Sequence, residues 1–354
     1  MNVLGVKNPG QVGRVGQVGR VDQAGQVGQV LLPDPPGPPD PPGPPDPAVR
    51  PLLGAHMSVA GGLPRAVERA VAHRCDAFQI FAKNANQWHG RPLPLAEIRE
   101  FRAKVEAAGI GPVVSHASYL INLATTSPGL LRQSMDAMGD ELDRAEALGL
   151  LGVVLHPGCY TLGNEAVGLA LIADRLLGLL RDRRRGRTMV LLEHTAGQGT
   201  ALGATFEQLA SIIAKMNDHR RVGVCLDTCH LIASGYDVCS PEGYAETFEQ
   251  FGRLVGFDRL KVLHLNDSKK PLGSRVDRHQ HIGQGFLGLE PFRRILNDPR
   301  FRGLPMLLET PKEEGRAKGV IGVDRFDEKN LATLRGLIEG SGESGRSGGL
   351  GKST

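Results

Sequence analysis

The stretch VGVCLD, residues 222–227, is a short apolar run that ends in a carboxylate. Seven further runs share its character: LLGAH (52–56), AFQIF (77–81), PVVSH (112–116), GVVLH (152–156), MVLLE (189–193), LKVLH (260–264) and PMLLE (305–309). Amphipathic segments such as 95–109 and 205–218 separate them. Continuous apolar strands that alternate with helices indicate a parallel sheet covered by helices. Eight such units predict an α/β fold, a (β/α)8 TIM barrel.

The residue that closes each run separates this fold from a doubly wound open sheet, which is the alternative. Seven of the eight runs end in His, Asp or Glu, which an open sheet does not require. In a barrel these C-terminal ends converge, and the active site lies there. Six closing residues of metal-binding type lie 34 to 45 residues apart: His116, His156, Glu193, Asp227, His264 and Glu309. Six convergent ligands are too many for one ion, so we expect several.

Length, cysteine content and charge limit the class of protein. A chain of 354 residues, 40% of them hydrophobic, can bury the core of one large domain. Its five scattered cysteines do not make a disulfide framework, and no window resembles a signal peptide or a membrane span. We therefore expect a soluble, cytoplasmic protein with no contact to membranes. The net charge of +4 neither requires nor excludes a nucleic acid.

The two ends of the chain differ in composition from its middle. Residues 10–30 repeat a Gly-Gln/Arg-Val triplet, and residues 33–51 hold eleven of the 24 prolines. Neither pattern can bury a core, so we expect residues 1–50 to be a disordered extension, either a functional tail or an over-extended reading of the gene. The Gly/Ser-rich residues 341–354 are expected to form a flexible tail, which leaves 51–340 as the barrel domain.

The segment CLDTCH (225–230) offers a metal two sets of ligands. Two thiolates, Cys225 and Cys229, would suit a structural zinc or a redox device, whereas Asp227 and His230 suit a partly open hydrolytic centre. If Asp227 points into the barrel mouth, alternation places Cys225 one layer lower, packed as a small apolar residue. Cys229 has no further thiols nearby in the sequence to complete a zinc set. We therefore expect Asp227 and His230, the latter in the loop after the strand, to bind metal.

A second pair of candidate ligands occurs in SRVDRHQHIGQG (274–285). Asp277 and His279 flank Arg278 after the seventh run, and alternation puts both on one side of an extended segment. The candidate ligands then number nine.

Several long segments follow one another in a specific order: GAHMS (54–58), KNANQW (83–88), SHASYLINL (115–123), LHPG (155–158), TAGQG (195–199), CLDTCH, LHLND (263–267), SRVDRHQHIGQG and LLET (307–310). Over about residues 52–315 they resemble the endonuclease IV family of apurinic/apyrimidinic (AP) endonucleases. The resemblance implies a DNA-repair enzyme with three zinc ions. Such an enzyme incises double-stranded DNA on the 5′ side of an abasic site and leaves a 3′-hydroxyl and a 5′-deoxyribose phosphate.

The resemblance also implies which residues hold the three zinc ions. The first would be bound by His116, His156 and Glu193, the second by Glu193, Asp227, His264 and Glu309, and the third by His230, Asp277 and His279. Three dications against four carboxylates leave a charge of about +2, which suits a phosphodiester. A hydroxide shared by two zinc ions would attack phosphorus, and the third ion would hold the leaving oxygen. Glu193 and Glu309 are the expected catalytic residues, the latter also in proton transfer.

An abasic site is recognised by opening DNA and inserting side chains into its stack. Tyr119 and Leu120 occupy the positions of the family's wedge residues, and Asn86 and Gln87 match a DNA-contacting loop. Trp88 is expected to pack within the protein rather than to stack on a base.

Other polar residues near these motifs have weaker assignments. His56 either contacts a metal ligand or a phosphate, or it is a structural histidine. His194 and His281 are expected to be loop residues rather than ligands. His194, Ala117 and Gln284 depart from the family's pattern. Because every expected ligand is present, these departures bear on rate and substrate preference rather than on the reaction.

Two other classes of function compete with a monomeric endonuclease acting on the nucleoid. A sugar isomerase or epimerase of related barrel type would use Glu, Asp and His for one or two divalent ions, so nine ligands argue against it. A catalytically inactive DNA-binding relative is disfavoured by the intact ligand set.

Overall fold

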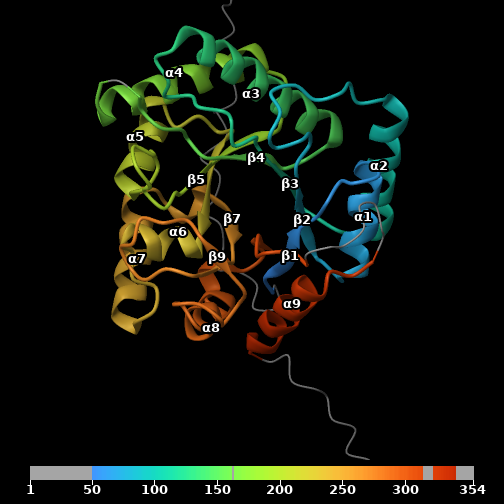
Figure 1. The fold of residues 1–354 in the computed structure, drawn as a ribbon, viewed down its shortest axis with the longest axis vertical. Coiled ribbons are helices and arrows are strands. Elements are labelled where there is room, and N and C mark those ends of the chain that lie inside the picture. The colour runs from blue at the N-terminus through green and yellow to red at the C-terminus, as the bar shows by residue number, and fades with distance from the viewer. Residues whose placement is uncertain (1–49, 162, 314–321, 340–354) are drawn as a thin grey trace, which may run out of the picture. The chain divides into compact units, whose positions relative to one another are not determined.

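The computed structural model describes residues 50–161, 163–313 and 322–339. Eight parallel strands close into a barrel in the order β1-β10-β7-β6-β5-β4-β3-β2 (Figure 1). They are β1 (Leu52–His56), β2 (Ala77–Ile80), β3 (Val113–His116), β4 (Gly152–Leu155), β5 (Met189–Glu193), β6 (Val222–Asp227), β7 (Leu260–His264) and β10 (Pro305–Leu308). The predicted TIM barrel is confirmed, and each predicted strand agrees with the observed strand to within one residue at either end.

Helices alternate with these strands and surround the barrel. They are α1 (Leu63–Ala72), α2 (Leu95–Ala108), α3 (Pro128–Leu148), α4 (Glu165–Asp182), α5 (Phe206–Lys215), α6 (Thr228–Ser234), α7 (Pro241–Leu254), α8 (Glu290–Asn297) and α9 (Arg325–Leu337). Two 3-10 turns, η1 (Phe257–Arg259) and η2 (Pro299–Phe301), precede β7 and β10. The amphipathic segments predicted at 95–109 and 205–218 form α2 and α5.

Local sequence signals explain where several helices begin and end. Asn164, Thr205 and Ser240 cap the first turns of α4, α5 and α7 by accepting a backbone hydrogen bond. Gly109 and Gly149 end α2 and α3 with φ of 62° and 74°, a left-handed conformation that side chains with a Cβ rarely adopt. The chain therefore turns back toward the next strand at these points.

Apolar side chains pack on both faces of the barrel strands. One cluster fills the interior and contains Ala77, Val114, Val154, Leu191, Cys225, Val262 and Leu307. A larger cluster lies between the strands and the helices and includes Phe78, Phe101, Phe206 and Phe292. Because both faces of each strand are buried, the strands read as continuous apolar runs in the sequence.

The structure contains a small antiparallel sheet that the sequence did not predict. Two short strands, β8 (Asp267–Ser268) and β9 (His279–Gln280), form an antiparallel pair after β7.

No helix in the described ranges is long and apolar enough to cross a bilayer. Apart from residue 50, the expected N-terminal extension lies outside the described residues, as does the expected tail at 341–354.

Candidate metal centre

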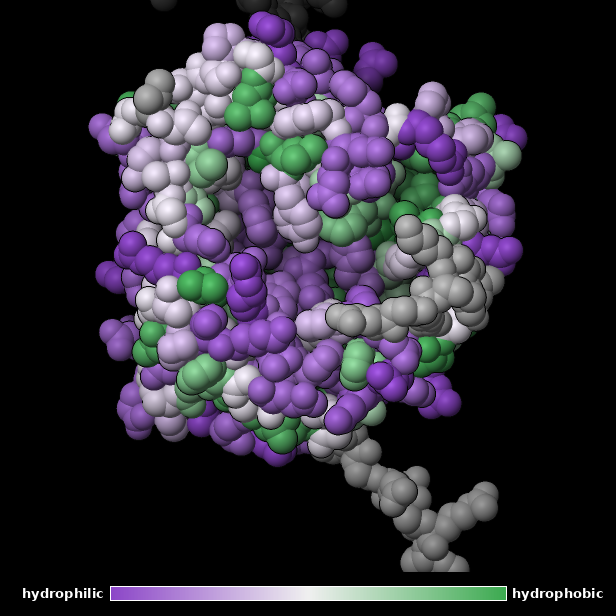
Figure 2. Space-filling model, in the orientation of Figure 1, coloured by the Kyte–Doolittle hydropathy of each residue, from purple (hydrophilic) through white to green (hydrophobic). Residues whose placement is uncertain are grey.

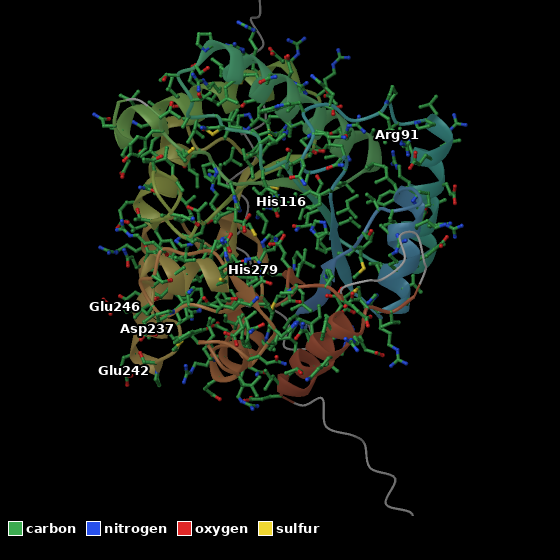
Figure 3. All side chains as sticks on the ribbon, in the orientation of Figure 1. Arg91, His116, Asp237, Glu242, Glu246 and His279 are labelled. Atoms are coloured by element: carbon green, nitrogen blue, oxygen red, sulfur yellow. The ribbon has the colours of Figure 1, made fainter. Side chains whose placement is uncertain are left out.

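Alternation along the strands places polar side chains above the apolar interior cluster. Two residues beyond each member of that cluster, the side chain faces the interior again. These residues are Gln79, His116, His156, Glu193, Asp227, His264 and Glu309, and His56 stands at the end of β1. Hydrophilic residues line the hollow at the centre of the face in Figure 2, and Figure 3 shows His116 and His279 near this centre.

The first cluster contains His116, His156 and Glu193, whose ligand atoms lie within 4.8 Å of one another. The Nε2 atoms of His116 and His156 lie 3.0 and 3.1 Å from Oε2 of Glu193. His116 Nδ1 lies 2.8 Å from the carbonyl oxygen of Ala117, to which it donates. In the neutral ring this hydrogen bond places the lone pair on Nε2, which is directed at the cluster, as a metal ligand requires. Because Ala117 contributes only a carbonyl, its departure from the family's pattern does not alter this contact.

Glu193 also belongs to a second cluster, with Asp227, His264 and Glu309. His264 Nδ1 lies 3.0 Å from Glu193 Oε1, 3.3 Å from Glu309 Oε2 and 3.9 Å from Asp227 Oδ2. Glu193 thus presents one oxygen to each cluster, which is the arrangement expected of a bridging carboxylate. The side chains of Glu193, Asp227 and His264 are fully buried.

Asp227 has a second role as the N-cap of α6. Its Oδ1 accepts hydrogen bonds from the backbone N–H groups of Cys229 and His230, at 2.6 and 3.0 Å. His230 therefore lies in the first turn of a short helix. The sequence analysis had placed it in a loop, and that prediction is wrong. The other oxygen, Oδ2, accepts from Asn266 and remains directed toward the cluster.

The third cluster joins His230 with Asp277 and His279. The Nε2 atoms of His230 and His279 lie 3.3 and 3.2 Å from the Asp277 carboxylate. Their Nδ1 atoms donate to the carbonyl oxygens of His194 and Glu309, at 2.8 and 3.1 Å. Among the described residues, the buried Nε2 of His279 has no hydrogen-bond partner. A metal ion would satisfy this atom, and nitrogen and carboxylate donors suit zinc.

The β8–β9 pair holds the third cluster in place. Ser268 pairs with His279 across it, and Asp267 accepts hydrogen bonds from the backbone N–H groups of Gly285 and Leu287. An added Cβ at position 285 would lie 2.3 Å from the carbonyl oxygen of Ser268, so only glycine fits there. Gln284, which departs from the family's pattern, is exposed on the same segment.

The charges of the third cluster compensate one another. Burial lowers the pKa of His230 and His279, but Asp227 and Asp277 outweigh it and raise these pKa values to about 10 and about 9. Burial raises the pKa of Asp277, yet the adjacent rings of His230 and His279 hold it well below its usual range. The carboxylates of this mouth thus require positive charge, which protons or metal cations supply.

Cys225 lies in the interior cluster below Asp227, where alternation predicted it. Its sulfur is within 4.8 Å of ligand atoms of Glu193 and His264, and Cys229 lies similarly close to Asp227. Burial raises the pKa of both thiols to about 12, so both stay protonated at neutral pH. Each thiol would therefore have to lose its proton before it could bind zinc. That neither cysteine binds metal remains a prediction.

The expected wedge residues lie at the rim of the centre, on the loop between β3 and α3. Tyr119 is 57% exposed, and its ring centroid lies 5.2 Å from that of His116 and 5.8 Å from that of His156. Leu120 is partly exposed. An exposed aromatic ring beside the clusters can contact a ligand that enters the mouth.

The expected DNA-contacting loop lies between β2 and α2. Asn86 and Gln87 are exposed on it, whereas Trp88 packs against the hydrophobic core, as predicted.

A buried ion pair connects this loop to the wedge loop. Lys83 Nζ lies 2.7 Å from Glu141 Oε1, with only 1% of each side chain exposed. Glu141 also accepts from the backbone N–H of Ser118, whose hydroxyl donates to the carbonyl of Ala85 at 2.6 Å. Both loops contact the Glu141 carboxylate, and they also contact each other through Ser118 and Ala85. They are therefore held as one unit.

The remaining histidines have other partners. His194 is buried and its Nε2 lies 3.1 Å from the carbonyl oxygen of Ala204, while burial lowers its pKa to about 3. His281 lies beside Asn330 and the ring of Phe326. Neither histidine belongs to a group of potential metal ligands found among the described residues, and that neither binds metal remains a prediction.

Sequence reasoning missed Gln79 of β2. Gln79 is fully buried, and its amide contacts His264, Glu309 and His56. The run AFQIF was not assigned a site residue because it ends in Phe81. Gln79 lies two residues before that end, so alternation along the strand turns it toward the barrel interior, like the closing residues of the other runs. A polar residue at the inward-facing position of an otherwise apolar run was the signal.

Cavities occur at both ends of the barrel. One of about 240 Å³ adjoins the metal clusters and is lined by Tyr119, His156, Gly197, His230 and Asp277, among others. It opens toward the TAGQG segment, which gives a ligand at the clusters room beside the wedge loop.

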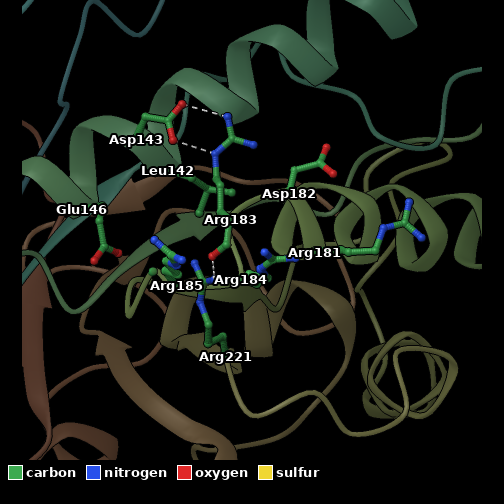
Figure 4. A pocket seen from close by; sticks show the side chains of 10 residues that line it. Leu142, Asp143, Glu146, Arg181, Asp182, Arg183, Arg184, Arg185 and Arg221 are labelled. Carbon is green, nitrogen blue, oxygen red and sulfur yellow. Dashed lines mark hydrogen bonds and ion pairs between the residues drawn. The ribbon is translucent and has the colours of Figure 1, made fainter.

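A second cavity, of about 640 Å³, lies where α4 leads into β5, at the opposite end of the barrel. Arginines 181, 183, 184, 185 and 221 line it (Figure 4). Arg183 pairs with Asp143 through two contacts of 2.7 and 2.8 Å, and Arg221 donates to the carbonyl oxygens of Thr188 and Arg183. These contacts join α3, α4 and the starts of β5 and β6, and residues at this end of a barrel serve stability.

Comparison with known proteins agrees with the class that this fold and site define. A family model described as xylose isomerase-like TIM barrel matches residues 67–328. A protein named probable endonuclease 4 from Chloroflexus aurantiacus is 50% identical over 291 residues, which cover 82% of this chain and 99% of the relative. Another of the same name from Trichlorobacter lovleyi is 48% identical over 285 residues, 80% of this chain and 99% of the relative. The crystal structure of endonuclease IV from Thermus thermophilus superposes with a TM-score of 0.71 and 40% identity, and the match covers 81% of this chain and 98% of that one.

The chain therefore belongs to the endonuclease IV family of AP endonucleases, as its motifs predicted. A solved D-tagatose 3-epimerase-like protein shares only the fold, with a TM-score of 0.60 at 17% identity over 81% of this chain and 96% of that one.

Proposed function

We propose that this protein is a zinc-dependent DNA-repair endonuclease that hydrolyses the phosphodiester bond 5′ to an abasic site. The products would be a 3′-hydroxyl and a 5′-deoxyribose phosphate. One observation carries the proposal: nine side chains from different elements converge on three adjoining clusters, two of which share Glu193. Family membership supports it, because the relatives named above are endonucleases.

Three zinc ions are the proposed cofactors, one for each cluster. Zinc ions bound there would make a hydroxide available at neutral pH and offset the charge that develops on the phosphate. Four carboxylates contribute to the three clusters, so three dications leave a charge of about +2 for an anionic substrate. The donor set fits this role, since the buried Nε2 of His279 lacks a hydrogen-bond partner among the described residues.

The chain's own residues orient these ligands and handle protons. His116, His230 and His279 each donate Nδ1–H to a backbone carbonyl and so direct Nε2 into the mouth. The Glu309 side chain is 11% exposed, in contrast to the fully buried Glu193. We propose that Glu309 accepts a proton from the attacking water, because solvent reaches its carboxylate but not that of Glu193.

Recognition of damage would fall to the loops at the rim. We propose that Tyr119 and Leu120 enter the stack at the abasic site and that Asn86 and Gln87 contact the DNA backbone. The buried pair of Lys83 and Glu141 holds the two loops together and so fixes their spacing before DNA binds. The proposed partner is double-stranded DNA with an abasic site, bound by a monomer of this protein in the cytoplasm.

The proposal is tested by incision of a 5′-labelled duplex that carries one abasic site. The wild-type protein should cut on the 5′ side of the site and leave a 3′ end that a polymerase extends. The matched control is Glu309→Gln, which should bind the same duplex but not incise it. No cut by zinc-loaded protein, or a cut on the 3′ side alone, would overturn the proposal.

A sugar isomerase or epimerase remains the alternative, because proteins of that activity share the fold. The third cluster disfavours it, since a site for one or two ions has no need of Asp277 and His279. Zinc content separates the two functions: about three ions per chain fits the endonuclease, and one or two fits the isomerase.

A further inference from the structure

Gln79 occupies a central position behind the second cluster. It lies on β2 with no exposed surface, and its side-chain amide has three polar neighbours. Oε1 lies 2.9 Å from Nε2 of His264, while Nε2 of the amide contacts Oε1 of Glu309 and lies 3.0 Å from Nδ1 of His56. Both the oxygen and the nitrogen of the amide therefore have polar partners in the mouth.

The neighbours of the amide fix its orientation. An ionised carboxylate only accepts hydrogen bonds, so the group of Gln79 that faces Glu309 is the NH₂. The carbonyl oxygen then faces His264 and accepts a hydrogen bond from Nε2–H of that ring. A flipped amide would place its oxygen against the Glu309 carboxylate and its NH₂ against the same N–H, which leaves two repulsive contacts. Only one orientation satisfies all three neighbours.

This orientation determines which nitrogen of His264 is free. With Nε2–H donated to Gln79, the neutral ring has its lone pair on Nδ1. Nδ1 is the atom that faces Glu193 and Glu309, at 3.0 and 3.3 Å. The tautomer of His264 is thus set by a side-chain amide, whereas backbone carbonyls set the tautomers of the ligand histidines 116, 230 and 279.

We propose that Gln79 is a positioning residue that sets the tautomer of His264 and the orientation of the Glu309 carboxylate for the second metal ion. The inference rests on the proposed function, since it assumes that this cluster binds zinc. It extends that function by adding a neutral residue of β2, the strand whose run does not end in His, Asp or Glu. Ligand histidines depend on such partners, and loss of one typically weakens metal binding roughly 10- to 100-fold.

The test compares Gln79→Leu with Gln208→Leu in the full-length, zinc-loaded protein. Gln208 is a buried glutamine of α5 that accepts hydrogen bonds from the backbone of Gly203 and Ala204 and touches none of the three clusters. Competition with a chelator gives the affinity of each bound zinc. We expect one zinc to bind roughly 10- to 100-fold more weakly in Gln79→Leu and wild-type affinities in Gln208→Leu.

Nitrogen NMR of 15N-histidine-labelled protein gives a second readout that needs no activity. Wild-type His264 should show the tautomer protonated at Nε2, and Gln79→Leu should lose this signature. If Gln79→Leu does not fold, Gln79→Met replaces it, because methionine has a similar length and no polar atoms. Wild-type zinc affinity together with an unchanged His264 tautomer would overturn the inference. If the wild-type protein binds zinc but does not incise DNA, the proposed function fails while these two readouts still decide the role of Gln79.

Discussion

Replacing Tyr119 and Leu120 together with alanine should reduce discrimination between abasic and intact DNA. Tyr119 is 57% exposed in the free protein, and a fully covered aromatic side chain buries about 150–250 Å². Insertion into a stack would therefore cover roughly 100 Å², worth about 2.5 kcal/mol at about 25 cal/mol per Å². Part of this gain offsets unstacking, which costs a few kcal/mol per step. We expect discrimination to fall at least tenfold, or about 1.4 kcal/mol, and by less than roughly a hundredfold.

The assay is binding of two duplexes of the same sequence, with and without one abasic site, at a fixed salt concentration. Because the wedge touches only DNA in this account, zinc content should equal that of the wild type. Val71→Ala is the matched control, since Val71 is 51% exposed but lies near the end of α1, away from the mouth. A double variant that discriminates as well as the wild type would show that these residues are not the wedge.

The remaining predictions concern the metal centre and the ends of the chain. Replacing Cys225 and Cys229 with alanine should leave zinc content unchanged, as measured by elemental analysis; loss of one zinc would make them ligands. A chain that starts at Val49 should melt and incise like the full-length protein, and a large drop in either property would assign a role to the N-terminal extension. Burial lowers the pKa of His230, but Asp227 outweighs it and the pKa is about 10, so this ring is protonated at neutral pH without metal. Burial also lowers the pKa of His279, but Asp227 and Asp277 outweigh it and raise the pKa to about 9. Zinc at the third cluster must displace both protons, so its affinity should rise by up to about a hundredfold per pH unit between pH 7 and 9 in chelator competition; an affinity independent of pH would contradict the assignment.

The barrel could be predicted from the sequence because its strands are buried on both faces. Each strand is therefore a continuous apolar run, and the polar residue that closes it marks the mouth. The position of Cys225 was predicted in the same way. Alternation of side chains along its strand placed it below Asp227, and it lies there in the interior cluster.

The features that were missed carry little periodic signal. β8 and β9 have only two residues each, too short for alternation to show, although they hold His279. His230 was expected in a loop because the N-cap role of Asp227 depends on a hydrogen bond that no spacing reveals. Gln79 was overlooked because its partners, His264 at the end of β7 and Glu309 just after β10, follow it by 185 and 230 residues, and only barrel closure creates these contacts.

The central claim is that nine side chains at the mouth hold three zinc ions. X-ray diffraction from crystals of the zinc-loaded protein, recorded above and below the zinc absorption edge, tests it most directly. We expect three anomalous peaks that vanish below the edge: one among His116, His156 and Glu193, a second beside Glu193, Asp227, His264 and Glu309, and a third among His230, Asp277 and His279. A single peak, or a peak bonded to the sulfur of Cys225 or Cys229, would contradict the account.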